Sequence, residues 1–266
     1  MSRRSAVGVG RTRVPLGTAY ALMLLFLYFP IAILFVFSFS TNTVLTFPLR
    51  GFTLDWFGEA FADASLQEAA RNSVLVGIGA ASIATVLGLG VSLAVSRFRF
   101  RGRLGLIALA GLPLIVPFVV LGVSLFLLFN LADLPRSLFA VGAGHTVIAL
   151  PFATLILLAR MGGLDPALED AAMDLGATYP ATLRRVVLPL MVPTILSAWL
   201  TCFIVSFDEV AIALFLAGGD PTFPVFLYGQ LRFAQRLPVL IAMAVMLALL
   251  TLTLTLIAFR LARRKP

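Results

Sequence analysis

Residues 169–190, EDAAMDLGATYPATLRRVVLPL, interrupt a chain that is otherwise almost continuously apolar. This stretch carries five charged side chains, yet it stands between apolar runs that are each long enough to cross a lipid bilayer. Because charged groups are costly inside the hydrocarbon core, such a segment is expected at the membrane surface. The stretch therefore separates two membrane spans, and its role bears on the function of the whole chain.

The composition is that of an integral membrane protein. Of the 266 residues, 61% are hydrophobic and 12% are charged, whereas roughly a quarter of the residues of soluble domains are charged. The net charge of +8 comes from short basic blocks beside the apolar runs, which argues against nucleic-acid binding. Cys202, the only cysteine, lies in an apolar run, so neither an intrachain disulfide nor a cysteine-cluster metal site is expected.

Six apolar segments are long enough to cross a core of ~30 Å as α-helices, which satisfy their own backbone groups there. They cover approximately residues 16–40, 72–96, 104–129, 138–160, 192–217 and 237–260. The first run is too long for a signal peptide, so it is interpreted as a retained span. Pro30, Pro113, Pro117 and Pro151 lie within spans and are expected to kink them. The sequence predicts an all-α membrane protein with six transmembrane helices.

Basic residues are distributed unevenly between the two sides of these spans. Fifteen lie on the side of both termini and of the connection between the fourth and fifth spans, and five lie on the other side. By the positive-inside rule, the side with more basic residues is cytoplasmic. We therefore expect basic cytoplasmic tails at 1–15 and 261–266, and a membrane domain at 16–260 with a cytoplasmic loop at 161–191.

The cytoplasmic loop is predicted to begin with a short amphipathic helix. Asp165 is expected to cap it, Pro166 to occupy its first position and Gly176 to end it. Apolar residues recur at helical spacing and form one stripe, and acids lie off that stripe. The stripe consists of Leu168, Ala171, Ala172 and Leu175, and the acids are Glu169, Asp170 and Asp174.

A second helical piece is expected to start near Thr178 and Pro180 and to be interrupted by Pro189 and Pro193. Two interpretations of the loop remain open from the residues alone: a helix that docks another protein, or a connector that lies on the lipid surface. Helices that lie on anionic lipid usually carry a basic polar face. The acidic face predicted here favours docking.

The loop resembles the EAA loop of the permease subunits of bacterial ABC importers. In that family Glu-Ala-Ala is followed after three residues by Gly and, after nine more, by Ile, one residue and Leu-Pro. The spacing from Gly176 to Pro189 agrees, while Asp170 replaces the glutamate and Val186 replaces the isoleucine. The candidate coupling residues are Glu169, Asp170, Ala171, Ala172, Gly176, Val186, Leu188 and Pro189.

In this family the loop forms a coupling helix that docks into a cleft of an ATP-hydrolysing subunit. The resemblance implies a type I ABC importer permease in the bacterial inner membrane. It also implies three kinds of partner: a second homologous permease subunit, two ATP-binding subunits and an extracytoplasmic solute-binding protein. Lys265, the one lysine, is not part of a phosphate-binding G-x-x-x-x-G-K-[ST] loop. This chain is therefore expected not to be an enzyme, and ATP and magnesium are expected on the partner subunits.

Asp208 and Glu209 lie inside the predicted fifth span, where ionisable groups usually face protein or water. On a continuous helix Ser197, Thr201 and Asp208 share one face, whereas Glu209 points about 100° away from Asp208. We expect the shared face to line the translocation path and Glu209 to pair with a neighbouring helix or a basic residue. The alternative is that residues of a partner chain satisfy both acids, which then never touch the solute.

The segments SFDEVAIALFLAGG (206–219) and PTFPVFLYGQLRF (221–233) resemble the second membrane subunit of polyamine importers. Acids in a path suit a cationic solute such as spermidine or putrescine, and Tyr228 and Phe233 are candidates for flanking a cation with their rings. Related permeases carry opines, aminobutyrate, iron or oxyanions, so these solutes remain alternatives, as does an ion-driven secondary transporter. Residues 218–236 are expected to form a re-entrant gate or an ordinary outer loop.

Two further features carry structural expectations. His145, the only histidine, begins the fourth span near the outer face and is expected to form hydrogen bonds at the membrane interface. Ala80, Ala84, Gly88 and Ser92 are spaced by four residues, which predicts a smooth face for close helix packing. No metal site is expected from this sequence.

Overall fold

The computed structural model describes residues 16–43 and 46–263, and α-helices dominate both ranges. The predicted N-terminal tail at 1–15 lies outside the described residues, as do residues 264–266 of the predicted C-terminal tail. The long helices are α1 (Leu16–Phe37), α3 (Ala64–Arg97), α6 (Leu138–Gly162), α9 (Leu188–Phe207) and α12 (Leu237–Arg263). The shorter helices are α2 (Asp55–Ala62), α4 (Arg103–Gly111), α5 (Phe118–Leu131), α7 (Ala167–Asp174), α8 (Tyr179–Thr182), α10 (Ala211–Leu216) and α11 (Phe223–Gln230). Within the described ranges there is no strand, only an isolated bridge between Ser40 and Phe52.

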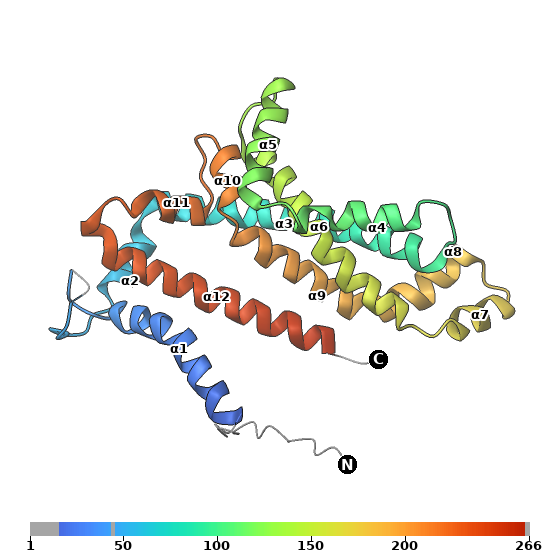
Figure 1. Ribbon diagram of the computed structural model, residues 1–266, viewed down its shortest axis with the longest axis horizontal. Helices are drawn as coiled ribbons and strands as arrows, with labels where there is room; N and C mark the ends of the chain where they lie inside the picture. Colours follow the sequence, from blue (N-terminus) through green and yellow to red (C-terminus); the bar gives the residue numbers. More distant parts are fainter. Residues whose placement is uncertain (1–15, 44–45, 264–266) are drawn as a thin grey trace, which may run out of the picture.

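Among the described residues, five helical segments are long and apolar enough to cross a membrane, and the bent pair α4–α5 makes a sixth if it counts as one span. The predicted all-α architecture is thus confirmed. The pair is bent by 103° at a 3₁₀ turn over Leu112–Leu114. Pro113 and Pro117 both lack the amide hydrogen that an unbroken helix needs, which explains a sharp turn where the sequence predicted only a kink. As a result, α5 projects away from the bundle (Figure 1).

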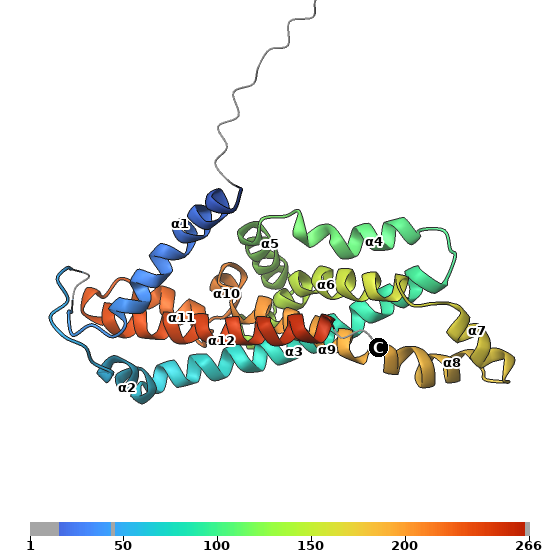
Figure 2. The same ribbon diagram turned by 90° about the horizontal axis from the view of Figure 1, so that it is seen from below.

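Helices α3, α6 and α9 pack against one another at the centre of the bundle, and α12 packs on α9 (Figures 1 and 2). Ala80, Ala84, Gly88 and Ser92 are all buried, which confirms the predicted packing face of α3. A Cβ atom on Gly88 would lie 2.7 Å from the Cβ of Ala153 in α6. Small side chains at these positions therefore let the two backbones approach closely, as is common where helices associate in lipid.

The fifth span differs from its prediction at both ends. A π-helical turn over Leu183–Val187 joins α8 to α9, so a single helical segment runs from Tyr179 to Phe207. Pro189 and Pro193 do not interrupt this segment: Pro189 lies in the first turn of α9, directly after the π turn, and Pro193 lies inside α9. At the other end α9 stops at Phe207, and α10 is a separate helix. The predicted continuous span over 192–217 is therefore wrong.

The bundle has two distinct ends. α7 and α8 lie together at one end, and α2 and α11 lie toward the other (Figure 1). Residues 218–236, predicted as a gate or a loop, contain α11 and a 3₁₀ turn over Ala234–Arg236, and α11 packs on α3. At this end Arg236 forms an ion pair with Asp63, the residue directly before α3. The candidate docking helix is thus separated from α11 by the length of the long helices.

Candidate functional site

The candidate docking helix α7 ends at a glycine, as predicted. Gly176 has a φ of +87°, the left-handed conformation that glycine adopts without steric strain. Its amide donates to the Met173 carbonyl at 2.9 Å, and the Ala177 amide donates to the Ala172 carbonyl at 3.1 Å. This pair of hydrogen bonds is the Schellman motif, which satisfies the last carbonyls of the helix. The predicted glycine stop is confirmed.

The start of α7 and the rest of the motif follow the prediction less closely. The Asp165 carboxylate accepts a hydrogen bond from the Ala167 amide at 3.0 Å, but the helix begins one residue later than predicted. Beyond the Gly176 turn, Val186 lies in the π turn and Leu188 begins α9, and both are half-buried. Pro189 is exposed near the start of α9. The motif residues therefore extend from α7 and the Gly176 turn to the π turn and the start of α9, with α8 between them.

The sequence did not predict which side of α7 faces the bundle. Its apolar stripe faces outward, with Leu168 48% exposed and Leu175 90% exposed. The buried residue is an acid, Glu169, whose Oε1 accepts a hydrogen bond from Arg97 Nε at 2.8 Å and lies 2.6 Å from Arg97 Nη2. Asp170 is exposed. Because Arg97 at the end of α3 draws Glu169 inward, the exposed surface of α7 combines apolar side chains with Asp170.

Asp208 and Glu209 lie in the break between α9 and α10, not inside a helix. Glu209 is buried, and both of its carboxylate oxygens accept hydrogen bonds from the Ile212 amide at 2.9 Å. Its Oε2 is 3.2 Å from His145 Nε2, within ion-pair distance but without hydrogen-bond geometry, and His145 Nδ1 is 2.8 Å from the Ser206 hydroxyl. The expected partner of Glu209 on a neighbouring helix is thus His145 of α6. The predicted interfacial position of His145 is wrong, because its side chain is fully buried.

Asp208 is exposed and lines an open groove of about 480 Å³ between the end of α9, α11 and α12. Tyr228 of α11 and Thr251 of α12 also line the groove, and apolar side chains of the same two helices supply most of the remaining wall. Phe233 is not among the lining residues, and its ring instead lies 5.2 Å from the Arg232 guanidinium. The groove therefore combines a carboxylate and an aromatic ring with apolar walls.

Ser197 and Thr201 are turned away from this groove. The buried Ser197 hydroxyl donates to the Ala258 carbonyl of α12 at 2.8 Å, and the Thr201 hydroxyl donates to the Ser197 carbonyl at 2.9 Å. The predicted polar stripe does not line this groove, because neither Ser197 nor Thr201 is among the lining residues, although the Asp208 amide, at the C-cap of α9, still donates to the Ile204 carbonyl at 3.0 Å. Of the candidate residues in or beside the path, the groove brings together Asp208 and Tyr228; the others are Ser197, Thr201, Glu209 and Phe233.

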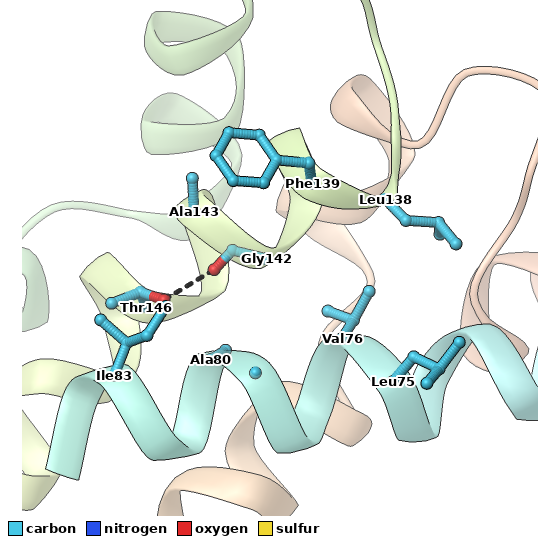
Figure 3. A pocket seen from close by; sticks show the side chains of 10 residues that line it. Leu75, Val76, Ala80, Ile83, Leu138, Phe139, Gly142, Ala143 and Thr146 are labelled. Carbon is cyan, nitrogen blue, oxygen red and sulfur yellow. Dashed lines mark hydrogen bonds between the residues drawn. The ribbon is translucent and has the colours of Figure 1, made fainter. Parts of the chain in front are cut away.

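A second open groove, of about 520 Å³, lies between α3 and α6 (Figure 3). Apolar side chains such as Leu75, Ile83 and Phe139 line it, and the Thr146 hydroxyl donates to the Gly142 carbonyl at 2.7 Å. This groove offers no charged side chain to a solute. Among the described residues, no three His, Cys, Asp or Glu side chains converge in a way that could hold a metal ion.

The sequence of the chain has known relatives. Residues 86–265 match the family described as binding-protein-dependent transport system inner membrane component. The spermidine/putrescine transport system permease protein PotC of Escherichia coli is 30% identical over 217 residues, which cover 81% of this chain and 82% of that protein. The putrescine transport system permease protein PotI of Escherichia coli is 33% identical over 192 residues, which cover 68% of each.

The fold also has a close counterpart among solved structures. It matches a chain from the crystal structure of a bacterial ABC transporter involved in the import of the acidic polysaccharide alginate, with a TM-score of 0.70. The match covers 97% of this chain and 99% of that chain at 17% sequence identity. At this identity the likeness concerns the fold alone, and it extends over almost the whole helical arrangement.

Proposed function

The chain belongs to the family of binding-protein-dependent transport system inner membrane components, and on that premise we propose a solute, a path and a set of partners. It is a permease subunit of an ABC importer and a multi-pass protein of the bacterial inner membrane. We infer that its solute is a polyamine, spermidine or putrescine, and that the chain forms half of the translocation path. The relatives PotC and PotI, whose names contain these solutes, support this choice.

The observation that carries the proposal is the exposed Asp208 carboxylate in the groove between α9, α11 and α12. A polyamine consists of ammonium groups separated by methylene chains. The carboxylate suits one ammonium group, and the Tyr228 ring suits a cation by the attraction of its face. The apolar walls, which include Leu227 and Leu247, suit the methylene groups. The remaining ammonium groups would meet the second permease subunit.

The alternative solutes fit this groove less well. Asp208 would repel an oxyanion, and it would repel the carboxylate of an opine or of aminobutyrate while attracting the cationic nitrogen of the same molecule. An iron ion would need more donor groups than the carboxylate of Asp208, the phenol of Tyr228 and the hydroxyl of Thr251 supply. The chemistry of the groove therefore favours an organic cation.

We propose the following partners from the EAA resemblance and the exposed surface of α7. They are a second homologous permease subunit, two ATP-binding subunits that hold ATP and magnesium, and an extracytoplasmic solute-binding protein. This chain is then a non-catalytic subunit. Closure of the ATP-binding subunits on ATP would displace α7, and the membrane helices would change from inward to outward access to receive the solute.

ATP-driven uptake of labelled spermidine tests the proposed function. The importer is purified through this chain, reconstituted in vesicles with its binding protein, and supplied with ATP. We expect uptake that requires ATP and is blocked by excess putrescine but not by excess molybdate. Preferential uptake of molybdate would contradict the proposed solute. Uptake driven by an ion gradient without ATP would instead support a secondary transporter.

A further inference from the structure

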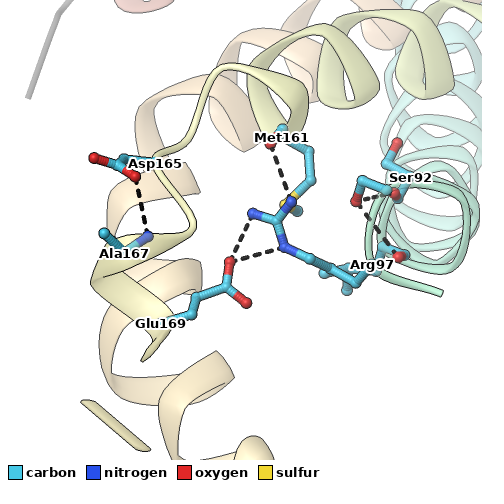
Figure 4. A network of polar contacts seen from close by, with 8 residues as sticks. Ser92, Arg97, Met161, Asp165, Ala167 and Glu169 are labelled. Carbon is cyan, nitrogen blue, oxygen red and sulfur yellow. Dashed lines mark hydrogen bonds and ion pairs between the residues drawn. The ribbon is translucent and has the colours of Figure 1, made fainter. Parts of the chain in front are cut away.

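Helix α7 is anchored to the bundle by an ion pair, not by apolar packing. Its buried residue is Glu169, whereas the apolar Leu168 and Met173 are exposed. The side chains of Arg97 and Glu169 are only 15% and 10% exposed. Figure 4 shows the Arg97 guanidinium reaching from α3 to the Glu169 carboxylate of α7. Burial of apolar surface therefore contributes little to the position of α7.

The same guanidinium joins three helices. Arg97 Nε and Nη2 lie 2.8 Å and 2.6 Å from one carboxylate oxygen of Glu169, and Nη1 donates to the Met161 carbonyl of α6 at 3.5 Å. Arg97 is the last residue of α3, which packs against both α6 and α9. The ion pair thus connects α7 directly to the central helices, in addition to the covalent connection through α8 to α9.

The chain on either side of α7 would otherwise allow this helix to rotate. Gly163 follows the end of α6, and Gly176, with its φ of +87°, follows α7. Glycine restricts the backbone less than any other residue does. Two nitrogens of the Arg97 guanidinium, Nε and Nη2, lie close to the same carboxylate oxygen of Glu169, which limits the directions in which Glu169 can move. The ion pair therefore restrains α7 at a place where the backbone alone restrains it weakly.

We propose that the Arg97–Glu169 ion pair transmits displacement of α7 to α3, so that α3 and α9 move together. The inference rests on the proposed docking of α7 onto an ATP-binding subunit. Both residues act as positioning residues, since they bind each other and touch neither the solute nor the reacting phosphate. Without the pair, a displaced α7 pivots about its flanking turns and moves α9 alone.

Spermidine uptake per ATP hydrolysed, measured in vesicles with the reconstituted importer, tests this role. Arg97→Gln and Glu169→Gln are each expected to lower this ratio about tenfold, a common size for coupling between two sites. Arg99→Gln is the matched control, because Arg99 is an exposed arginine on the same segment, and it is expected to leave the ratio unchanged. A purely structural role would reduce the amount of assembled importer without changing the ratio in what remains.

If a single variant fails to assemble, the double variant with exchanged charges, Arg97→Glu with Glu169→Arg, tests the inference. It is expected to restore most of the ratio, and failure to restore it counts against the inference. Wild-type ratios in both single variants overturn the inference and leave the proposed function intact. If the wild-type importer does not couple spermidine uptake to ATP hydrolysis, the proposed function fails instead.

Discussion

Two pairs of adjacent acids, Glu169–Asp170 and Asp208–Glu209, have the same charge but opposite surroundings within each pair. In both pairs one acid is buried against a basic or polar side chain from another helix, while its neighbour is exposed. The buried members are Glu169 and Glu209, and the exposed members are Asp170 and Asp208. In the sequence, the Glu169–Asp170 pair precedes α9 and the Asp208–Glu209 pair follows it.

Within each pair, the direction in which the side chain points determines the role of the acid more than its chemical type does. In α7 a step of one residue turns a side chain by about 100°, so Glu169 and Asp170 cannot face the same neighbour. Asp208 and Glu209 lie in the break between α9 and α10, and their side chains diverge there. The buried acids Glu169 and Glu209 hold one helix to another. The exposed acids are available to other molecules: a solute for Asp208 and an ATP-binding subunit for Asp170, as proposed.

Removal of the buried acid after α9 is expected to have the largest effect. Glu209→Ala leaves the Ile212 amide and His145 without their buried partner, which costs about 3 kcal/mol of folding free energy. Thermal unfolding of the purified protein in detergent measures this loss. The matched variant Asp208→Ala is expected to keep the wild-type Tm. Equal Tm shifts in Glu209→Ala and Asp208→Ala would contradict the difference between the buried and the exposed acid.

Removal of its exposed neighbour is expected to affect transport and not folding. Asp208→Asn removes a charge-assisted contact to the cation of about 1.5 kcal/mol, which corresponds to a roughly tenfold loss of spermidine uptake. Asp208→Glu keeps the charge and is expected to retain most of the uptake. Initial rates in reconstituted vesicles measure both variants. Wild-type uptake in Asp208→Asn would remove Asp208 from the path.

The turn after α7 is expected to show a smaller, local effect. Gly176→Ala places an alanine at a φ of +87°, which costs about 1 kcal/mol. Hydrogen exchange of the α7 amides is then expected to accelerate about fivefold. The control is Gly105→Ala in α4, where an added methyl group meets no atom within 4 Å. If Gly105→Ala accelerates exchange in α4 as much as Gly176→Ala accelerates it in α7, the left-handed conformation of Gly176 is not the cause of the effect.

The Asp63–Arg236 ion pair is intermediate between buried and exposed, and its effect is expected to be the smallest. The two side chains are 15% and 38% exposed, respectively. Burial raises the pKa of Asp63, but the hydrogen bonds from Arg236 and the Leu66 amide outweigh it and hold the pKa below the usual 3.8. The pair therefore stabilises the fold fully above that pH, and the contribution disappears as the pH falls through the lowered pKa.

Asp63→Asn is accordingly expected to cost less than about 1 kcal/mol near neutral pH, as for other partly exposed pairs. Its Tm and that of the wild type are expected to converge in strongly acidic solution. Thermal unfolding at several pH values measures the difference. A difference that grows as the pH falls would contradict the sign of the pKa shift.

The parts of the fold that the sequence predicts depend on local patterns. Six apolar runs indicate the spans, because the hydrophobic length needed to cross a bilayer is set by neighbouring residues alone. The small residues of α3 and the Gly176 stop are local as well, since spacing by four and a single left-handed residue are visible in a few positions. The EAA spacing from Gly176 to Pro189 is local in the same way, and the docking role that it implies stays a prediction.

The contacts that orient the acids depend on distant residues, and the sequence does not predict them. Arg97 and Glu169 are 72 residues apart, and nothing near Arg97 indicates its partner. The sequence pattern does not show where α9 ends, because apolar residues continue on both sides of Asp208 and Glu209. The local signal for that end is the acid itself, because a carboxylate three residues before Ile212 can accept hydrogen bonds from the first amides of a new helix.

In the proposed function, transport by this chain depends on docking of α7 to an ATP-binding subunit, and co-purification from native membranes measures that docking directly. Tagged wild-type chain is expected to recover an ATP-binding subunit whose ATPase rate rises with spermidine-loaded binding protein. Gly176→Arg is expected to remain in the membrane and to recover little of that subunit. Recovery of the wild-type chain without any ATP-binding subunit would contradict the proposed coupling, as would undiminished spermidine-stimulated ATPase in Gly176→Arg.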